Sequence, residues 1–163
     1  MIGAPERERL STGELLVVAQ GLARTASSWP GTEDPRTRSW LTVAATDRYE
    51  AFVIAWPQGG TIELHDHGDS AGAVVVARGS LVETVVGHDV DGSLVAVSRS
   101  LDEGGHLEFE PGHVHDIVNR GPGPALSVHV YSPVLRSMTF FEARDDVLLV
   151  AVRTEDYSTG SSS

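Results

Sequence analysis

The sequence predicts an all-β protein, a small antiparallel barrel or sandwich preceded by one short helix. From Trp40 onward the chain is a succession of short stretches rich in β-branched and aromatic residues. Turn-forming Gly, Pro and Asp residues separate these stretches at roughly ten-residue intervals, which is typical of sandwiches and barrels. The chain has 163 residues, enough for one domain with a sizeable apolar core but not for two ordinary domains.

The only predicted helix covers residues 11–24. Ser11 and Glu14 form the pattern of a capping box, and apolar residues recur at helical spacing from Leu15 to Leu22. We expect this helix to cover one side of the core. Residues 25–38 contain two prolines and no periodic apolar pattern, so they are predicted to be a connecting loop. Residues 1–38 are therefore expected to form a segment that packs on the barrel.

The predicted strands form one barrel over residues 39–155. Turn signals such as Asp91-Gly92 and Pro111-Gly112 separate them. Residues 156–163 end in STGSSS and are predicted to be a flexible tail. The stretches expected as strands are 41–46, 49–56, 61–65, 73–77, 81–86, 94–98, 106–109, 114–118, 126–131, 138–142 and 147–152.

The composition excludes several kinds of active site. All twelve cationic side chains are arginine, which excludes a lysine Schiff base and the usual phosphate-binding loop. The chain has no cysteine, so disulfides, thiolate zinc sites and a cysteine nucleophile are excluded, and a metal ion would need His, Asp or Glu ligands. Because the formal net charge is −11, nucleic acid is not an expected partner.

The chain shows no membrane segment in its sequence. No apolar run approaches the ~18 residues that a membrane-spanning helix needs. The first ten residues mix acidic residues with arginines and lack the apolar centre of a secretory signal. We therefore expect a cytoplasmic protein, and a monomer is the default expectation for a small barrel of this charge.

Histidine carries most of the information about function. His65 and His67 are two residues apart on an extended chain, so both imidazoles leave the same face of the sheet. One such pair alone is better explained by a solvated or structural role. A second pair, His113 and His115, follows the Pro111-Gly112 turn at the start of a strand that can return beside the first. Chance seldom supplies two such pairs.

A third pattern lies in the predicted strand 126–131. Ser127, His129 and Tyr131 alternate there and line one face of the strand. A serine can orient a histidine, and a histidine can orient a phenol. An ordinary strand with alternating polar residues explains the pattern equally well, so the residues alone leave both interpretations open.

Glycine, proline and histidine recur with a spacing that resembles the two motifs of the cupin superfamily. The matching residues are Gly59, His65, His67 and Gly79 in the first motif, and Gly104, Pro111, Gly112, His115 and Asn119 in the second. The resemblance implies a cupin double-stranded β-helix, a jelly-roll barrel that holds one metal ion, with His65, His67 and His115 as ligands. It gives no ligand role to His113, for which a structural role is expected.

This chain departs from the superfamily pattern at one ligand. The pattern has a glutamate between His67 and Gly79, and Gly72 stands at that place here. The resemblance therefore implies a site of three neutral imidazoles, which leaves about three positions of the ion open for substrate and O₂. Such a site favours Fe(II).

Within the superfamily, the chain resembles the bacterial type of the cysteine dioxygenase family. The resemblance runs from about Tyr49 to Glu155 and is carried by TIELHDHGDSAG, PGHVHDIVNRG and ALSVHVYSP. It implies a non-haem Fe(II) enzyme that converts a small organic thiol and O₂ to the sulfinate, with Ser127, His129 and Tyr131 as a chain beside the metal. Animal members carry a cysteine at the position of Gly72, crosslinked to the tyrosine, whereas bacterial members commonly carry glycine.

The resemblance also suggests a residue that binds substrate. Cysteine-specific members place an arginine before the first motif, where it pairs with the substrate carboxylate, and Arg38 matches this position with a shift of one residue. A solvated loop arginine is the alternative. The thiol stays open among cysteine, cysteamine, a mercapto acid and a thiol-imidazole such as ergothioneine. Two other functions also stay open: a cupin oxygenase or isomerase of another substrate class, and a non-catalytic metal-binding cupin that acts as a sensor.

Overall fold

In the computed structural model, which describes residues 8–29 and 36–157, helix α1 spans Thr12–Ala23. The Ser11 hydroxyl accepts a hydrogen bond from the Glu14 backbone N–H at 3.2 Å, so the helix begins where the capping pattern predicts. A short 3₁₀ helix, η1 (Ala26–Ser28), follows inside the segment that was expected to be only a loop. Residues 30–35 of that predicted loop lie outside the described residues.

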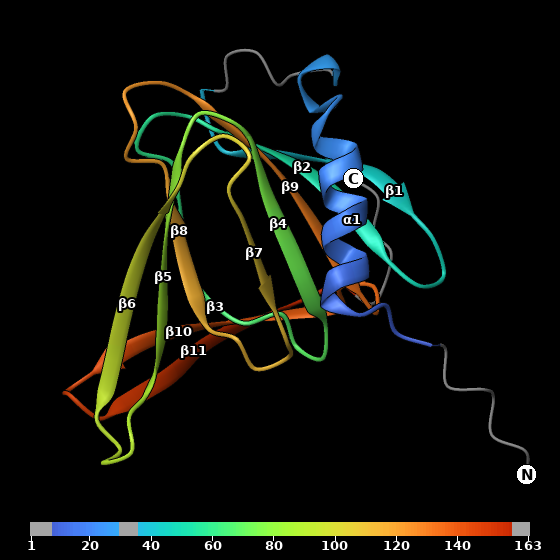
Figure 1. Ribbon diagram of the computed structural model, residues 1–163. Coiled ribbons are helices and arrows are strands. Elements are labelled where there is room, and N and C mark those ends of the chain that lie inside the picture. Colours follow the sequence, from blue (N-terminus) through green and yellow to red (C-terminus); the bar gives the residue numbers. More distant parts are fainter. Residues whose placement is uncertain (1–7, 30–35, 158–163) are drawn as a thin grey trace, which may run out of the picture.

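Eleven strands follow along the described part of the chain, and each predicted strand has a counterpart (Figure 1). They are β1 (Ser39–Ala45), β2 (Glu50–Trp56), β3 (Thr61–His65), β4 (Ala71–Arg78), β5 (Leu81–His88), β6 (Leu94–Leu101), β7 (His106–Phe109), β8 (His115–Val118), β9 (Ala125–Ser132), β10 (Ser137–Arg144) and β11 (Leu148–Asp156).

The strands form two antiparallel sheets. One has five strands in the order β1-β2-β9-β4-β7, and the other has six in the order β11-β10-β3-β8-β5-β6. Residues from both sheets share one apolar core, which includes Trp56 and Val74 from the first sheet and Leu81 and Ile117 from the second. Two antiparallel sheets closed around one core make a jelly-roll barrel.

Helix α1 covers the outer face of the five-stranded sheet (Figure 1). Its buried residues Leu15 and Ala19 pack in one cluster with Val53, Val128 and Val130. Strand β9 is therefore buried on both faces along its whole length. Its valines face the helix, and the alternate residues Ser127, His129 and Tyr131 are left to face the interior of the barrel.

The C-terminal strand is longer than the predicted one. Strand β11 reaches Asp156, and the Tyr157 backbone N–H donates to the Arg136 carbonyl at 2.6 Å. The segment predicted as a flexible tail from residue 156 therefore begins with two ordered residues. The rest of that segment, residues 158–163, lies outside the described residues.

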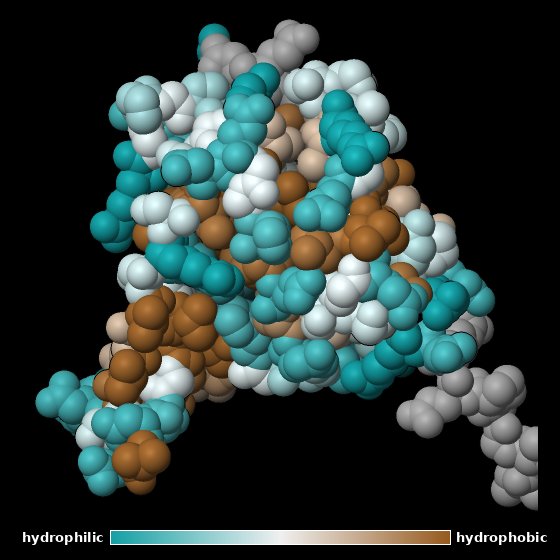
Figure 2. Space-filling model, in the orientation of Figure 1, coloured by the Kyte–Doolittle hydropathy of each residue, from teal (hydrophilic) through white to brown (hydrophobic). Residues whose placement is uncertain are grey.

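One exposed apolar region lies at the end of the barrel formed by the β5–β6 hairpin, where Figure 2 shows apolar side chains gathered. The exposed large apolar residues of this region are Val90, Val95 and Val97, and Val147 and Leu148 are exposed where β11 begins.

Because β6 is an edge strand, a second chain can pair with its outer backbone groups beyond Leu94, whose N–H donates to the Asp146 carbonyl at 2.7 Å. The monomer expected from the sequence stays a prediction that size-exclusion chromatography can check.

A membrane-spanning helix is not found within the described residues, because the twelve-residue α1 is too short to cross a bilayer. The cytoplasmic location stays a prediction.

Candidate metal centre

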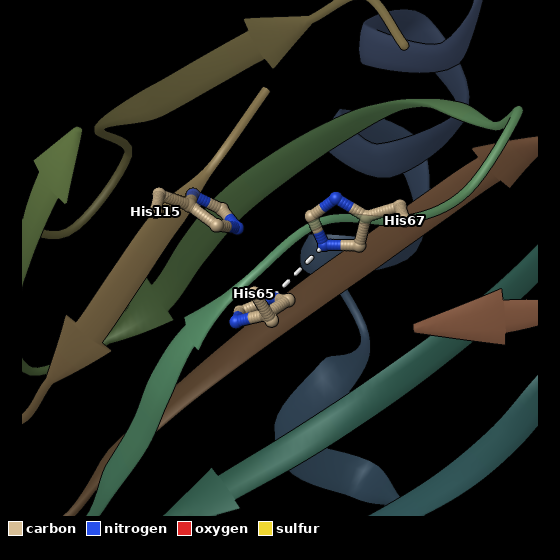
Figure 3. Close-up of side chains that lie close together, drawn as sticks. All are labelled: His65, His67 and His115. Carbon is tan, nitrogen blue, oxygen red and sulfur yellow. Dashed lines mark hydrogen bonds between the residues drawn. The ribbon is translucent and has the colours of Figure 1, made fainter. Parts of the chain in front are cut away.

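Three histidines point toward one another inside the barrel (Figure 3). His65 ends β3, and His115 begins β8 directly opposite it in the antiparallel pair, so both side chains lie on the same face. His67 follows two residues after the end of β3. The ring centroids are 4.7 Å apart for His65 and His67, 4.7 Å for His65 and His115, and 5.0 Å for His67 and His115. One nitrogen from each ring lies within 4.8 Å of the others, which suits a shared metal ion.

The hydrogen bonds of these rings leave nitrogen lone pairs available. The His65 Nδ1–H donates to the Glu63 carbonyl at 2.7 Å, and the His115 Nδ1–H donates to the Glu83 carboxylate at 3.0 Å. In neutral rings the two Nε2 atoms are then unprotonated. His65 Nε2 lies 3.1 Å from His67 Nε2.

Two buried nitrogens, His115 Nε2 and His67 Nδ1, have no hydrogen-bond partner among the described residues. A buried polar atom without a partner is costly, and a metal ion bound to His115 Nε2 would satisfy that atom. The donor set therefore fits a divalent metal ion.

The three rings are neutral at physiological pH. Burial lowers the pKa of His65 to about 3, with a further contribution from His115. Burial also holds the pKa of His67 well below its ordinary value, and it lowers that of His115 although the hydrogen bond to Glu83 opposes this change. Neutral imidazoles are the form that binds a metal ion.

The metal-free protein is expected to lose stability as the pH falls below about 6.5. The pKa values of His65 and His129 are about 3 in the folded protein, so below about pH 6.5 the unfolded chain binds protons that the folded chain does not. Each of these histidines then lowers the free energy of unfolding by up to about 1.4 kcal/mol per pH unit, until its folded pKa is reached. Urea denaturation at pH 7.5, 6 and 5 measures this slope, and a free energy of unfolding that stays constant over this range would contradict it.

Glu83 is a site residue that the sequence interpretation missed. Its side chain is 0% exposed, and its Oε1 atom accepts hydrogen bonds from His113 at 2.8 Å and from His115 at 3.0 Å. Its Oε2 atom accepts from Arg99 at 2.9 Å. Burial alone would raise the pKa of Glu83, but the hydrogen bonds from His113, His115 and Arg99 outweigh it and lower the pKa. The only signal in the sequence is a glutamate between Leu81 and Val85, on the inward-facing side of an apolar strand.

The residues of β9 form the hydrogen-bonded chain that the resemblance implies. Ser127 Oγ lies 2.8 Å from His129 Nε2, and His129 Nδ1 lies 3.3 Å from the Tyr131 hydroxyl oxygen. Trp56 extends the chain, because its indole N–H donates to Ser127 Oγ at 2.8 Å. Burial lowers the pKa of His129 to about 3 and raises the pKa of Tyr131. The histidine is therefore neutral and the tyrosine is protonated at pH 7.

His67 is held by aromatic rings. Its ring stacks on Phe109 at 4.5 Å and on Tyr131 at 5.1 Å, and the other side of Phe109 stacks on His113 at 5.0 Å. Gly72 lies between Phe109 and Tyr131 in the sheet, as the direct partner of both. A Cβ atom built on Gly72 would overlap the end of the Phe109 ring. The ring of Phe109 thus fills the space that a side chain at position 72 would take.

Replacing Gly72 by alanine is expected to destabilise the protein by about 1–3 kcal/mol, the usual cost of overpacking. The Phe109 ring cannot move aside freely, because His67 and His113 stack against it. In the Phe109→Leu background, adding Gly72→Ala is expected to cause a much smaller loss of unfolding free energy. Urea denaturation measures both differences, and equal losses in the two backgrounds would rule out this clash.

A cavity of about 600 Å³ opens beside His65, and His129 and Tyr131 also form part of its wall. Arg38 also lines it, so the structure brings this residue to the same cavity as His65 and Tyr131. The Arg38 guanidinium lies 5.9 Å from the Trp40 ring and 5.7 Å from the Trp56 ring, and burial lowers its pKa. Arg38 makes no hydrogen bond or ion pair with another described residue, which leaves its donors available.

The second arginine of the cavity is already neutralised. Arg153 donates to Glu63 at 2.9 Å and lies 3.5 Å from the Glu155 carboxylate. Of the two arginines lining the cavity, Arg153 is paired with carboxylates at short range, whereas Glu155 and Glu63 attract Arg38 only at longer range.

Comparisons with known proteins agree with this fold. The family model described as cysteine dioxygenase type I matches residues 19–144. Among solved structures, TT1209 from Thermus thermophilus is 21% identical with a TM-score of 0.52, and the match covers 62% of this chain and 88% of that one. An oxalate oxidase in complex with the substrate analogue glycolate is 20% identical with a TM-score of 0.52, over 62% of this chain and 53% of that one.

A cupin domain is also among the matches. The cupin domain of Schizosaccharomyces pombe Cnp3 is 12% identical with a TM-score of 0.52, over 63% of this chain and 65% of that one. At these identities the likeness concerns the fold alone. It confirms the predicted cupin barrel with one short helix.

Proposed function

Since the chain belongs to the cysteine dioxygenase type I family, we propose that it is a thiol dioxygenase, which converts a small organic thiol and O₂ to the corresponding sulfinate. The observation that carries this proposal is the cluster of three buried, neutral imidazoles, of which His65 lines a cavity together with Tyr131. In the reaction R–SH + O₂ → R–SO₂H, both oxygen atoms form bonds to sulfur. The sulfur loses the four electrons that O₂ gains, so no other reductant is needed.

His65, His67 and His115 are the residues that would hold the metal ion, for which we propose Fe(II). Three neutral nitrogen ligands leave about three positions of an octahedral ion for exogenous groups. When bound, the ion would supply the affinity for an ionised thiol and the reactivity with O₂ that the side chains lack. The chain itself then has no need of a strong base or a nucleophile.

The hydrogen-bonded chain on β9 prepares the Tyr131 hydroxyl as a donor. We assign its direction from Trp56, whose indole N–H can only donate. With Ser127 donating to His129 Nε2, the His129 Nδ1–H donates to the Tyr131 oxygen. The Tyr131 O–H is then free to donate into the cavity, to the substrate or to oxygen.

Arg38 would bind the carboxylate of a thiol acid. Replacing Arg38 by methionine is expected to lower kcat/KM about 10–100-fold for cysteine or a mercapto acid, because a charge-assisted hydrogen bond contributes about 1.5–3 kcal/mol. Cysteamine has no carboxylate, so its kcat/KM should not change. Steady-state O₂ uptake measures both, with Arg36→Met as control because Arg36 does not line the cavity. Equal losses for both thiols would remove Arg38 from substrate recognition.

The proposed function is tested by O₂ uptake of the Fe(II)-loaded protein with cysteine, cysteamine, a mercapto acid and ergothioneine. We expect stoichiometric O₂ consumption with at least one thiol, and a product heavier by both atoms of ¹⁸O₂ in mass spectrometry. Bound iron without O₂ consumption for any thiol would instead favour a non-catalytic cupin. Turnover of only non-thiol substrates, with Mn or Ni as the metal, would favour another cupin oxygenase or isomerase.

A further inference from the structure

We propose that Glu83 is a positioning residue of the metal centre, which holds His115 with Nε2 toward the ion and makes His115 the strongest donor of the three ligands. The inference rests on the metal site of the proposed function but not on its reaction. It concerns a residue outside both histidine pairs and outside the cavity wall.

The sheet places Glu83 behind His115. In the pairing of β5 with β8, Val85 lies opposite His115 and Glu83 lies opposite Ile117. Glu83 is therefore the diagonal neighbour of His115 on the same face of the sheet. The carboxylate reaches His115 Nδ1 at 3.0 Å and leaves Nε2, on the other side of the ring, toward His65 and His67.

The three rings differ in what holds the nitrogen that faces away from the ion. A carboxylate accepts from His115, a neutral backbone carbonyl accepts from His65, and His67 Nδ1 has no partner among the described residues. A carboxylate polarises the imidazole more than a carbonyl does, and so raises its basicity as a ligand. The order of donor strength expected from these contacts is His115, His65, His67.

Glu83 divides its charge among three donors. The Oε1 atom that accepts from His115 also accepts from His113 at 2.8 Å, and Oε2 accepts from Arg99. The side chains of His113 and Arg99 are 19% and 50% exposed, so both lie between Glu83 and solvent. Removing the His113 hydrogen bond should leave more of the Oε1 charge to His115. Replacing Glu83 should therefore weaken metal binding, whereas replacing His113 should strengthen it. A network that only supports the fold would not change the metal affinity in opposite directions.

The test is the dissociation constant for Co(II) alone, measured by competition with a chromophoric chelator at constant pH. Glu83→Gln keeps the shape of the side chain and removes its charge, and it is expected to weaken Co(II) binding about 10–100-fold. His113→Phe keeps a ring on Phe109 and is expected to bind Co(II) at least as tightly as the natural protein. His106→Gln is the matched control, because His106 is an exposed residue of β7 outside the network. The thermal midpoint of each metal-free variant reports whether the fold is kept.

Glu83→Gln leaves Arg99 without its carboxylate partner, which can prevent folding. In that case the double variant Glu83→Gln/Arg99→Met is compared with Arg99→Met, and the same 10–100-fold loss is expected. Natural affinity in the folded Glu83 variant, or equal losses for the Glu83 and His113 variants, would overturn the proposal. Binding of a second Co(II) that His113→Phe abolishes would also overturn it, because Glu83, His113 and His115 would then be ligands of a separate ion.

The outcome is separable from that of the proposed function. If the protein binds Co(II) and Glu83→Gln weakens that binding, but no thiol is oxidised, the role of Glu83 is supported and the proposed reaction is wrong. If thiols are oxidised while Glu83→Gln binds Co(II) normally, the reaction is supported and the role of Glu83 is wrong.

Discussion

Replacing His67 by leucine is expected to weaken metal binding about 10²–10³-fold and, with it, to remove most of the thiol-dependent O₂ consumption. Four-ligand zinc sites contribute about 10–16 kcal/mol, so one ligand corresponds to about 2.5–4 kcal/mol, or about 10²–10³-fold in affinity. His67 is the clearest ligand to remove, because its Nδ1 makes no hydrogen bond to another described residue. Leucine has nearly the volume of histidine and keeps the space between Phe109 and Tyr131 filled. Metal content after dialysis and O₂ uptake measure the effect.

His88→Leu is the matched control for this variant. The His88 ring lies 3.0 Å from the Val147 carbonyl at an exposed end of β5, away from the three-histidine cluster. The control is expected to retain one metal ion per chain. A His67→Leu protein that also retained its full complement of metal would show that these histidines are not the ligands.

Replacing Tyr131 by phenylalanine is expected to lower kcat about 10²–10³-fold, the usual effect of losing one preorganised hydrogen-bond donor. The ring that stacks on His67 is kept, so metal affinity should not change. The KM for the thiol should change little, because the hydroxyl acts on the reacting groups more than on the bound substrate. Steady-state kinetics together with the Co(II) dissociation constant separate these effects.

The control for Tyr131 is Tyr49→Phe, since Tyr49 packs against the cluster under helix α1 and does not line the cavity. Its kcat should equal that of the natural protein. If Tyr131→Phe also turned over at the natural rate, the Trp56-Ser127-His129-Tyr131 chain would have no part in the reaction.

Much of the fold could be predicted because the signals are local. The Ser11 cap and the apolar spacing after it predict α1, and period-two alternation with intervening turns predicts the strands. The interior placement of Ser127, His129 and Tyr131 follows from the same alternation. The end of the last strand was not predicted correctly. Strand β11 continues to Asp156 because its pairing with β10 extends to Ser137.

The pattern of short strands and turns predicts an antiparallel barrel, and the composition excludes cysteine and lysine chemistry. Spacing along one strand decides which side chains share a face, so it predicts the pairing of His65 with His67 and the alignment of Ser127, His129 and Tyr131. The type of barrel and the set of three ligands came from the resemblance to the cupin motifs. The side chains that contact these histidines and the Ser127-His129-Tyr131 chain are known only from the tertiary structure. Glu83, Phe109 and Trp56 reach the site through the pairing of β5 with β8, β7 with β4, and β2 with β9. Register between strands distant in the chain depends on packing across the whole sheet, and a single strand's pattern does not contain that information.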